Sequence, residues 1–376
     1  MTNEEKIRIA EESIYAYFCL DDPEHKAAIL AANAGVSDEA RRIHRESIVI
    51  DALAFYVETY NWYLQESGVT AMNLTVPHIY GGMGQAVWRI IDHFGVIKRD
   101  PEHFMLIETG DDIRKAKKEN KIGLIIGSQT ARFIEHGELE SSVEIFSKMG
   151  LRIMQLGYNG QGFACDGCLC EANSGLTAAG RRVVKAMEEY GITIDLSHIS
   201  EKAVFDTMEL CTKPPIFSHA NPRELFDHPR NITAEEAKKV AELGGVICPT
   251  QYMPMIWNRK NLPTIEDYMN AIDYFVDLIG IDHVGLGVDS NAEPAGYDRM
   301  DCRRLMDMPH PNRDVYLACA EAGLGKASSY PAGIFGIANH VNIVDHLIKR
   351  GYCEADIKKI IGLNLLRVFD QTWPAK

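Results

Sequence analysis

Short apolar runs alternate with longer segments whose apolar residues recur at helical spacing. Eight runs of strand length span residues 46–55, 68–76, 122–129, 151–160, 192–200, 214–220, 245–251 and 282–290. Segments with helical spacing lie between them, for example 85–97, 178–191 and 267–280. Repeated strand–helix units predict parallel strands, and eight such units close most economically into a (β/α)8 TIM barrel of the α/β class.

A doubly wound open sheet is the alternative topology. It is disfavoured because no glycine-rich phosphate loop follows the first run, and because polar residues end many runs instead of gathering at one switch point. Residues 1–45 have helical spacing, with a helix stop expected at Gly35. We therefore expect an N-terminal helical extension over 1–45 and one barrel over 46–376, a length that needs no second domain.

Composition and charge limit the partners. The net charge of −14 leaves no basic stripe for nucleic acid or anionic lipid. The N-terminus is charged from Glu4 and lacks an apolar stretch of signal-peptide length, and no segment has twenty uninterrupted apolar residues. Nine cysteines, an odd number, fit reduced thiols better than a disulfide framework. We expect a cytoplasmic protein with no nucleic-acid or membrane partner.

Two histidines end neighbouring apolar runs. His198 closes DLSH and His219 closes FSH, 21 residues further along the chain. Parallel barrels keep metal and substrate at the carboxyl ends of their strands, and imidazole is the commonest protein ligand for zinc-like ions. The pair therefore indicates part of a metal site, although each histidine alone is equally typical of a strand end bonded to backbone. The other polar residues at run ends are Gln129, Tyr158, Asn159 and Asp289.

Three further features suggest chemistry and keep a structural alternative. Asp289 ends the apolar run VGLGVD, where it can bind a metal, accept a proton or cap the next helix. Arg230, followed by Asn231 in HPRN, suits a bidentate grip on a carboxylate, and equally a surface ion pair. Cys165, Cys168 and Cys170 have the spacing of part of a zinc site. No second cysteine pair and no histidine at ligand spacing accompany them.

Four segments carry a family resemblance: residues 175–200 (GLTAAGRRVVKAMEEYGITIDLSHIS), 217–233 (FSHANPRELFDHPRNIT), 282–290 (DHVGLGVDS) and 360–369 (IIGLNLLRVF). In this order they resemble the membrane (renal) dipeptidase family of zinc peptidases, within the amidohydrolase superfamily of metal-dependent barrels. The resemblance extends from about residue 48 to the C-terminus. It implies that His198 and His219 bind the second zinc, that Arg230 holds the substrate carboxylate and that Asp289 handles the proton.

The chain departs from that family pattern at three places. The family's first strand carries an HxD pair that binds the first zinc, and here the matching residues are Leu53 and Phe55. The family's bridging glutamate matches Gln129, a neutral amide that offsets no metal charge. The histidine that the family uses to polarise the scissile carbonyl matches Tyr158.

These residues include the histidines of the family's second zinc position and lack the HxD ligands of its first. We expect a one-metal hydrolase of a small amide or amino-acid derivative, with one Zn²⁺ held by His198, His219 and Gln129. Asp289 is then the base and Tyr158 the oxyanion donor, while Arg230, Asn159 and Asn231 bind substrate.

Other functions stay open on this barrel. The chain is alternatively a catalytically silent member that binds a small carboxylate, or a lyase or isomerase that uses Asp289 and Tyr158 as acid and base. A two-metal dipeptidase remains a further reading if ligands come from the segment that contains Cys165, Cys168, Cys170 and Glu171. In each case we expect a small carboxylate or amide as the ligand, and a homodimer or larger homo-oligomer as the assembly.

Overall fold

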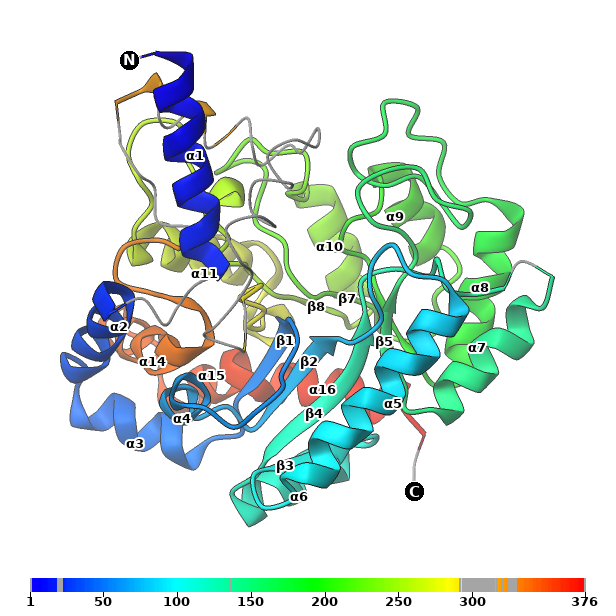
Figure 1. The fold of residues 1–376 in the computed structure, drawn as a ribbon, viewed down its shortest axis with the longest axis horizontal. Coiled ribbons are helices and arrows are strands. Elements are labelled where there is room, and N and C mark those ends of the chain that lie inside the picture. Colours follow the sequence, from blue (N-terminus) through cyan, green and yellow to red (C-terminus); the bar gives the residue numbers. More distant parts are fainter. Residues whose placement is uncertain are drawn as a thin grey trace.

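A curled parallel sheet surrounded by helices forms the body of the protein (Figure 1). The structure is a computed structural model that describes residues 2–18, 23–135, 137–290, 292, 315, 317–318, 321–323 and 330–374. The strands are β1 (Ile50–Ala54), β2 (Ala71–Thr75), β3 (Phe104–Ile107), β4 (Ile122–Ser128), β5 (Leu151–Gln155), β6 (Thr193–Asp195), β7 (Ile216–Phe217) and β8 (Val246–Ile247).

Helices precede β1 and then follow the strands. The α-helices are α1 (Asn3–Phe18), α2 (Pro23–Ala34), α3 (Asp38–Glu46), α4 (Trp62–Ser67), α5 (Met83–Arg99), α6 (Gly110–Glu119), α7 (Leu139–Lys148), α8 (Ala178–Glu189), α9 (Glu201–Met208), α10 (Ala234–Glu242), α11 (Ile265–Ile279), α14 (His340–Lys349), α15 (Glu354–Lys358) and α16 (Asn364–Thr372). Short 3-10 turns lie at Met253–Met255, Ile281–His283 and Gly336–Asn339, and a π turn lies at Lys359–Leu363.

The predicted barrel is confirmed by the strand order. The strands pair in parallel as β1-β2-β4-β5-β6-β7-β8. Residues 284–290 close the ring, because Val284 bridges Ile247 of β8 and Ser290 bridges Ala54 of β1. The sequence did not predict β3, a four-residue run that pairs with the first half of β4 outside the ring.

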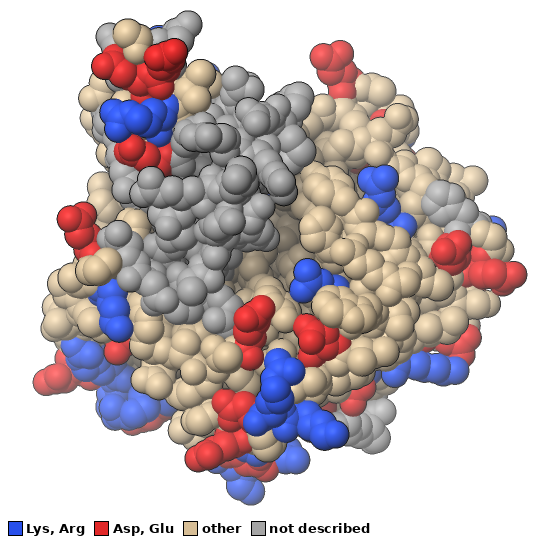
Figure 2. All heavy atoms as spheres, in the orientation of Figure 1, with Lys and Arg blue, Asp and Glu red and all other residues tan. Residues whose placement is uncertain are grey.

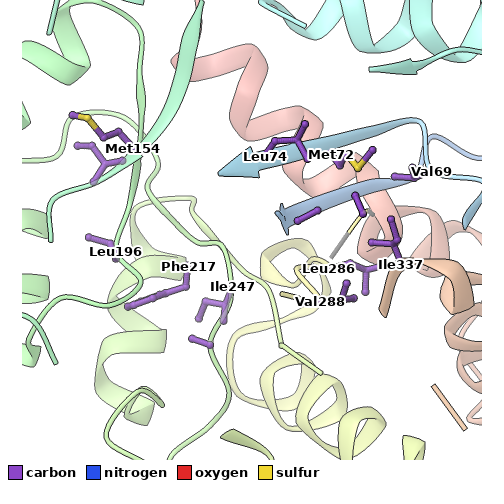
Figure 3. Close-up of a cluster of buried hydrophobic side chains, with 14 of the residues drawn as sticks. Val69, Met72, Leu74, Met154, Leu196, Phe217, Ile247, Leu286, Val288 and Ile337 are labelled. Atoms are coloured by element: carbon purple, nitrogen blue, oxygen red, sulfur yellow. The ribbon is translucent and has the colours of Figure 1, made fainter. Parts of the chain in front are cut away.

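Alternate residues of the strands enter two separate buried clusters. One cluster lies against the surrounding helices and includes the residues labelled in Figure 3, among them Met72 and Leu74 of β2 and Phe217 of β7. The other cluster joins intervening strand residues such as Ile153 to α16, whose Leu365 is fully buried. Burial of both faces explains why the strands read as nearly continuous apolar runs.

Helix caps fix the loops that follow the histidine strands. Ser200 begins α9 two residues after His198, and its side chain accepts a hydrogen bond from the Ala203 amide. Thr233 begins α10 in the same way and shares a reciprocal capping box with Glu236. A side-chain cap stabilises a helix start by about 1 kcal/mol, so the chain is pinned immediately beyond the barrel mouth.

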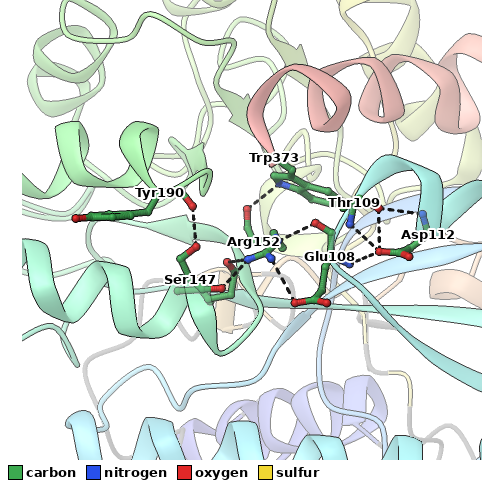
Figure 4. A network of polar contacts seen from close by, with 8 residues as sticks. Glu108, Thr109, Asp112, Ser147, Arg152, Tyr190 and Trp373 are labelled. Atoms are coloured by element: carbon green, nitrogen blue, oxygen red, sulfur yellow. Dashed lines mark hydrogen bonds and ion pairs between the residues drawn. The ribbon is translucent and has the colours of Figure 1, made fainter. Parts of the chain in front are cut away.

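A buried guanidinium ties three elements together near the start of β5 (Figure 4). Arg152 donates to the carbonyls of Glu108 and Ser147, each at 2.8 Å. The indole Nε1 of Trp373, just beyond α16, donates to the Arg152 carbonyl at 3.0 Å and to the Thr193 hydroxyl at 2.8 Å. The network satisfies the buried charge with fixed carbonyls and anchors the C-terminal helix to the barrel.

The surface carries charged side chains of both signs. On the face in Figure 2, Lys and Arg side chains are interspersed with Asp and Glu, and the surface is hollowed near its centre. Within the described residues, no helix combines the length and apolar character that a membrane crossing requires.

The Trp373 anchor gives a stability prediction. We expect Trp373→Phe to lower the free energy of unfolding by about 1–3 kcal/mol, because the change leaves the buried Thr193 hydroxyl without its indole donor. Denaturant unfolding measures this loss. Trp88→Phe is the matched control, since Trp88 is 59% exposed. Equal stability of the two variants would show that the indole hydrogen bonds do not anchor α16.

Candidate active site

His198 and His219 meet at the end of the barrel where β6 and β7 end. Their Nε2 atoms lie 2.8 Å apart, and both residues are buried, with 6% and 0% of their surface exposed. Burial and the nearby Arg230 lower the pKa of His219 well below its usual value, so His219 is neutral at pH 7. The structure therefore brings together the two imidazoles that the sequence singled out.

A carboxylate at the end of β6 orients His219. Asp195 accepts four hydrogen bonds, from the Gln155 amide, the Ser218 hydroxyl and the backbone amides of Ser197 and Ser218. Because the Ser218 hydroxyl donates to Asp195 at 2.5 Å, its oxygen is left to accept from Nδ1–H of His219 at 2.7 Å. This chain of bonds fixes the tautomer of His219, with the Nε2 lone pair facing His198.

His198 is held from the other side by the loop after β5. Its Nδ1 lies 2.7 Å from Oδ1 of Asn159, which also accepts a weak bond from the Cys168 thiol at 3.6 Å. The ring of Tyr158 stacks on the imidazole, with centroids 4.1 Å apart. Since an amide oxygen accepts, Nδ1 of His198 donates a proton to Asn159, and Nε2 of the same ring faces Nε2 of His219.

Two nitrogen lone pairs at 2.8 Å would repel each other, and either a proton or a metal ion between the two Nε2 atoms removes that repulsion. The pattern in which Nδ1 donates to a protein acceptor while Nε2 stays open is the usual preparation of histidine for a metal. Tetrahedral zinc, with Zn–N distances of about 2.0–2.1 Å, places two nitrogens about 3.3 Å apart, so a small separation of the rings suffices. The donor set fits a divalent cation.

Three residues at this end of the barrel have left-handed backbone conformations. The φ angles are +48° at Asn159, +70° at His198 and +57° at Asp289. A non-glycine residue in this region stores roughly 1 kcal/mol or more of strain, which persists only where the surroundings impose it. All three are residues that the sequence placed at the barrel mouth, so the strain is concentrated at the candidate site.

Asp289 lies between β8 and β1 in the closing segment. Its backbone amide donates to the Leu53 carbonyl at 3.1 Å, and 9% of its surface is exposed. Burial raises the pKa of Asp289 to about 7, with Arg230 acting in the opposite direction and Asp51 adding to the rise. A carboxyl group that titrates near neutral pH is suited to accept and return a proton.

Arg230 supplies a buried positive charge beside the histidines. It is 5% exposed, and its guanidinium donates to the His219 carbonyl at 3.0 Å. Within the described part of the chain, none of the ion pairs includes Arg230. A buried guanidinium satisfied by a carbonyl alone retains the donors and the charge that a ligand carboxylate needs.

The other predicted residues occupy the same end of the barrel with different partners. Gln129 follows β4, and its amide nitrogen donates to the Thr75 hydroxyl at 2.9 Å. The Asn231 amide nitrogen donates to the carbonyls of Phe226 and Met255, each at 2.8 Å, so this side chain holds its own loop in place. Ligation by Gln129 and substrate binding by Asn231 stay predictions.

Apolar side chains occupy the positions of the family's HxD pair. Leu53 is 1% exposed, and Phe55 packs against the main core cluster. Across the residues that the structure describes, no three side chains of His, Cys, Asp or Glu converge as a metal-binding group. Burial raises the pKa of the Cys168 thiol to about 11, which keeps it protonated at neutral pH. The structure thus presents a two-histidine site without a second cluster beside it.

Sequence reasoning missed the residues that orient the histidines. Asp195 and Ser218 are the residues three before His198 and one before His219, so the motifs DLSH and FSH already contained them. Asn159 was predicted to bind substrate, which stays a prediction, and in this structure its Oδ1 contacts Nδ1 of His198. Asp51 and His340 form a second unpredicted pair, fully buried at 2.9 Å and 289 residues apart.

Two cavities flank the stacked Tyr158 and His198. One, of 350 Å³, is lined by His198, Cys168, Arg223, His228 and Arg230. The other, of 220 Å³, lies on the Tyr158 side and is lined by Tyr80, Arg132, Leu156, Gln161 and Phe163. Tyr158 thus lines one cavity and His198 lines the other, and their rings stack on each other.

Comparison with known proteins gives matches over most of the chain. Residues 26–307 match the membrane dipeptidase family, peptidase family M19. A curated relative, the dipeptidase tcpJ of Claviceps purpurea (strain 20.1), is 26% identical over 261 residues, which cover 69% of this chain and 53% of the relative. The chain thus spans about half the length of this curated relative.

Solved structures match the fold along nearly their whole length. An amidohydrolase from Pseudomonas aeruginosa is 30% identical, with a TM-score of 0.76 over 89% of this chain and 99% of that one. A metallo peptidase from Rhodobacter sphaeroides, liganded with a phosphinate mimic of the dipeptide L-Ala-D-Ala, has a TM-score of 0.70 at 17% identity, over 87% of this chain and 100% of that one.

The raised pKa of Asp289 predicts a specific dependence of stability on pH. Between about pH 4 and pH 7 the folded protein keeps a proton that the unfolded chain has lost, so stability falls as pH rises, by at most about 1.4 kcal/mol per unit. In chelator-treated protein, the free energy of unfolding of Asp289→Asn should therefore rise relative to the parent across this window. A difference that does not change with pH would contradict the assignment.

Proposed function

Because the chain belongs to the membrane dipeptidase family, peptidase family M19, we propose that it is a metal-dependent hydrolase that cleaves the amide bond of a small peptide-like carboxylate. The observation that carries the proposal is the buried histidine pair, whose Nδ1 atoms are both held by acceptors and whose Nε2 atoms face each other at 2.8 Å. This arrangement, with Nδ1 held by a protein acceptor and Nε2 turned toward the second ring, is typical of histidines that bind a metal ion.

We propose one zinc ion per chain, held by His198 and His219. Gln129 is the candidate third ligand, and remaining positions are left to water and substrate. A bound zinc ion supplies Lewis acidity, which polarises a carbonyl and acidifies water. A first zinc of the family type has no donors at Leu53 and Phe55, so we expect the site to operate with a single ion.

Arg230 binds the substrate carboxylate in this proposal. Its guanidinium is buried, lies beside His219 and takes part in no ion pair with another described residue. The dipeptide mimic in the Rhodobacter sphaeroides structure supports a substrate of the same size and charge. A carboxylate bound at Arg230 places the adjacent amide bond next to the two histidines.

Asp289 and Tyr158 then handle charge during the reaction. With a pKa of about 7, Asp289 is substantially ionised at neutral pH and accepts a proton from the attacking water before passing it to the leaving amine. Burial raises the pKa of Tyr158, so its hydroxyl stays protonated and can donate to the oxygen that gains charge. Stacking on His198 fixes the ring that carries this hydroxyl.

Activity is tested by a substrate screen with paired variants. Protein supplied with zinc should hydrolyse members of a panel of dipeptides, N-acyl amino acids and cyclic amides, and Asp289→Asn should reduce turnover by about 10²–10⁴ because it keeps the shape of the side chain and removes the base. Asp282→Asn, an exposed aspartate in the same run, is the control. Turnover of Asp289→Asn within about threefold of the parent would remove Asp289 from the mechanism.

Metal content is tested by elemental analysis after dialysis. We expect about one zinc ion per chain in the parent and a loss of most of it in His219→Ala, because a single imidazole cannot retain the ion. His103→Ala is the control, since His103 precedes β3 and stacks on Tyr60. Two stoichiometric ions would contradict a one-metal site, and no binding at excess zinc would favour a silent carboxylate-binding member.

A further inference from the structure

Arg132 lines the cavity on the Tyr158 side, and its guanidinium has no partner among the described residues. Arg132 is exposed, and its backbone amide donates to the Thr130 hydroxyl at 3.1 Å. Its side chain makes no hydrogen bond or ion pair with any residue that the structure describes. Other exposed arginines have acidic partners, as Arg114 has with Asp370 and Arg182 has with Glu140.

The turn that carries Arg132 is held rigidly from below. The neighbouring residues Ala131, Phe133 and Ile134 are 0–1% exposed, and the Ile134 amide donates to the Ala131 carbonyl at 3.0 Å. Phe133 packs edge-on against Phe146 of α7, with centroids 4.5 Å apart. Arg132 is therefore the exposed member of an otherwise buried turn, directed away from the core at the end of β4.

The walls of this cavity suit one short substrate group. Tyr80 contacts Tyr158 edge-on at 6.3 Å between centroids, and Leu156 and Phe163 supply apolar surface. The volume of 220 Å³ is smaller than the roughly 300–1,000 Å³ of pockets that enclose a drug-sized ligand, so the cavity matches a single side chain. A guanidinium in such a space selects a carboxylate, through charge and two parallel hydrogen bonds.

We propose that Arg132 is a specificity residue that binds an acidic side chain on the acyl side of the scissile amide. This inference rests on the proposed function, in which Arg230 binds the carboxylate on the leaving-group side. The two arginines line different cavities, which Tyr158 and His198 also line, one each, with their rings stacked on each other. The preferred substrates are thus small peptides or N-acyl amino acids with one carboxylate at each end.

The matched pair L-Glu-L-Ala and L-Gln-L-Ala tests this inference, because the two dipeptides differ only by the charge on the acyl side. The parent should prefer L-Glu-L-Ala by about tenfold or more in kcat/KM. Arg132→Gln should reduce this ratio to about one, mainly through a raised KM for L-Glu-L-Ala, while L-Gln-L-Ala is hydrolysed within about twofold of the parent rate. Arg230→Lys should instead weaken both substrates by a similar factor.

The outcomes separate this inference from the proposed function. An unchanged preference in Arg132→Gln, or no preference in the parent, would overturn the role of Arg132 and leave the hydrolase intact. If neither these dipeptides nor any member of the wider substrate panel is hydrolysed, the proposed function fails, and calorimetric binding of the two dipeptides to parent and Arg132→Gln still tests Arg132. Tighter binding of L-Glu-L-Ala that disappears in Arg132→Gln supports the inference, and equal binding contradicts it.

Discussion

The candidate site depends on hydrogen bonds that hold both imidazoles from behind. Asp195 accepts four donors and orders the Ser218 hydroxyl, which in turn fixes the tautomer of His219, while Asn159 does the same for His198. Without these acceptors each ring is free to carry its proton on Nε2, and the pair becomes an ordinary hydrogen bond. With them, the two Nε2 atoms face each other at 2.8 Å, and the pair is suited to hold a cation.

Arg230 and Asp289 are two of the charged residues in the candidate site. Arg230 lowers the pKa of His219 and opposes the rise in the pKa of Asp289, so a single guanidinium influences both the proposed metal ligand and the proposed base. On the opposite side, Leu53 and Phe55 extend the apolar core into the place where the family keeps its first zinc. Apolar packing thus replaces the HxD ligands at Leu53 and Phe55. The polar residues of the site remain at the same end of the barrel: His198, His219, Arg230 and Asp289.

The sequence predicted the barrel because all eight ring strands are buried on both faces and read as apolar runs. It missed β3, since four residues beside β4 carry too short a pattern to distinguish from a loop. It located His198, His219, Arg230 and Asp289 because each ends a run or belongs to a short motif. The contacts between residues distant in the chain could not be read from local pattern, as the buried pair of Asp51 and His340 shows.

The orientation of side chains was equally inaccessible to sequence. The sequence did not predict that Asn159 contacts His198 or that the Asn231 amide donates to two backbone carbonyls. Left-handed backbone at His198 and Asp289 follows from how the closing segment and the loop after β6 fit the ring, which no propensity predicts.

We propose that this chain binds one metal ion at the histidine pair, where the family pattern has two metal positions. An anomalous difference map, recorded at the zinc edge from crystals grown with zinc, distinguishes one site from two. We expect a single strong peak between the Nε2 atoms of His198 and His219. A second peak of similar height near Leu53, Phe55 and Gln129, or a single peak away from the histidine pair, would contradict it.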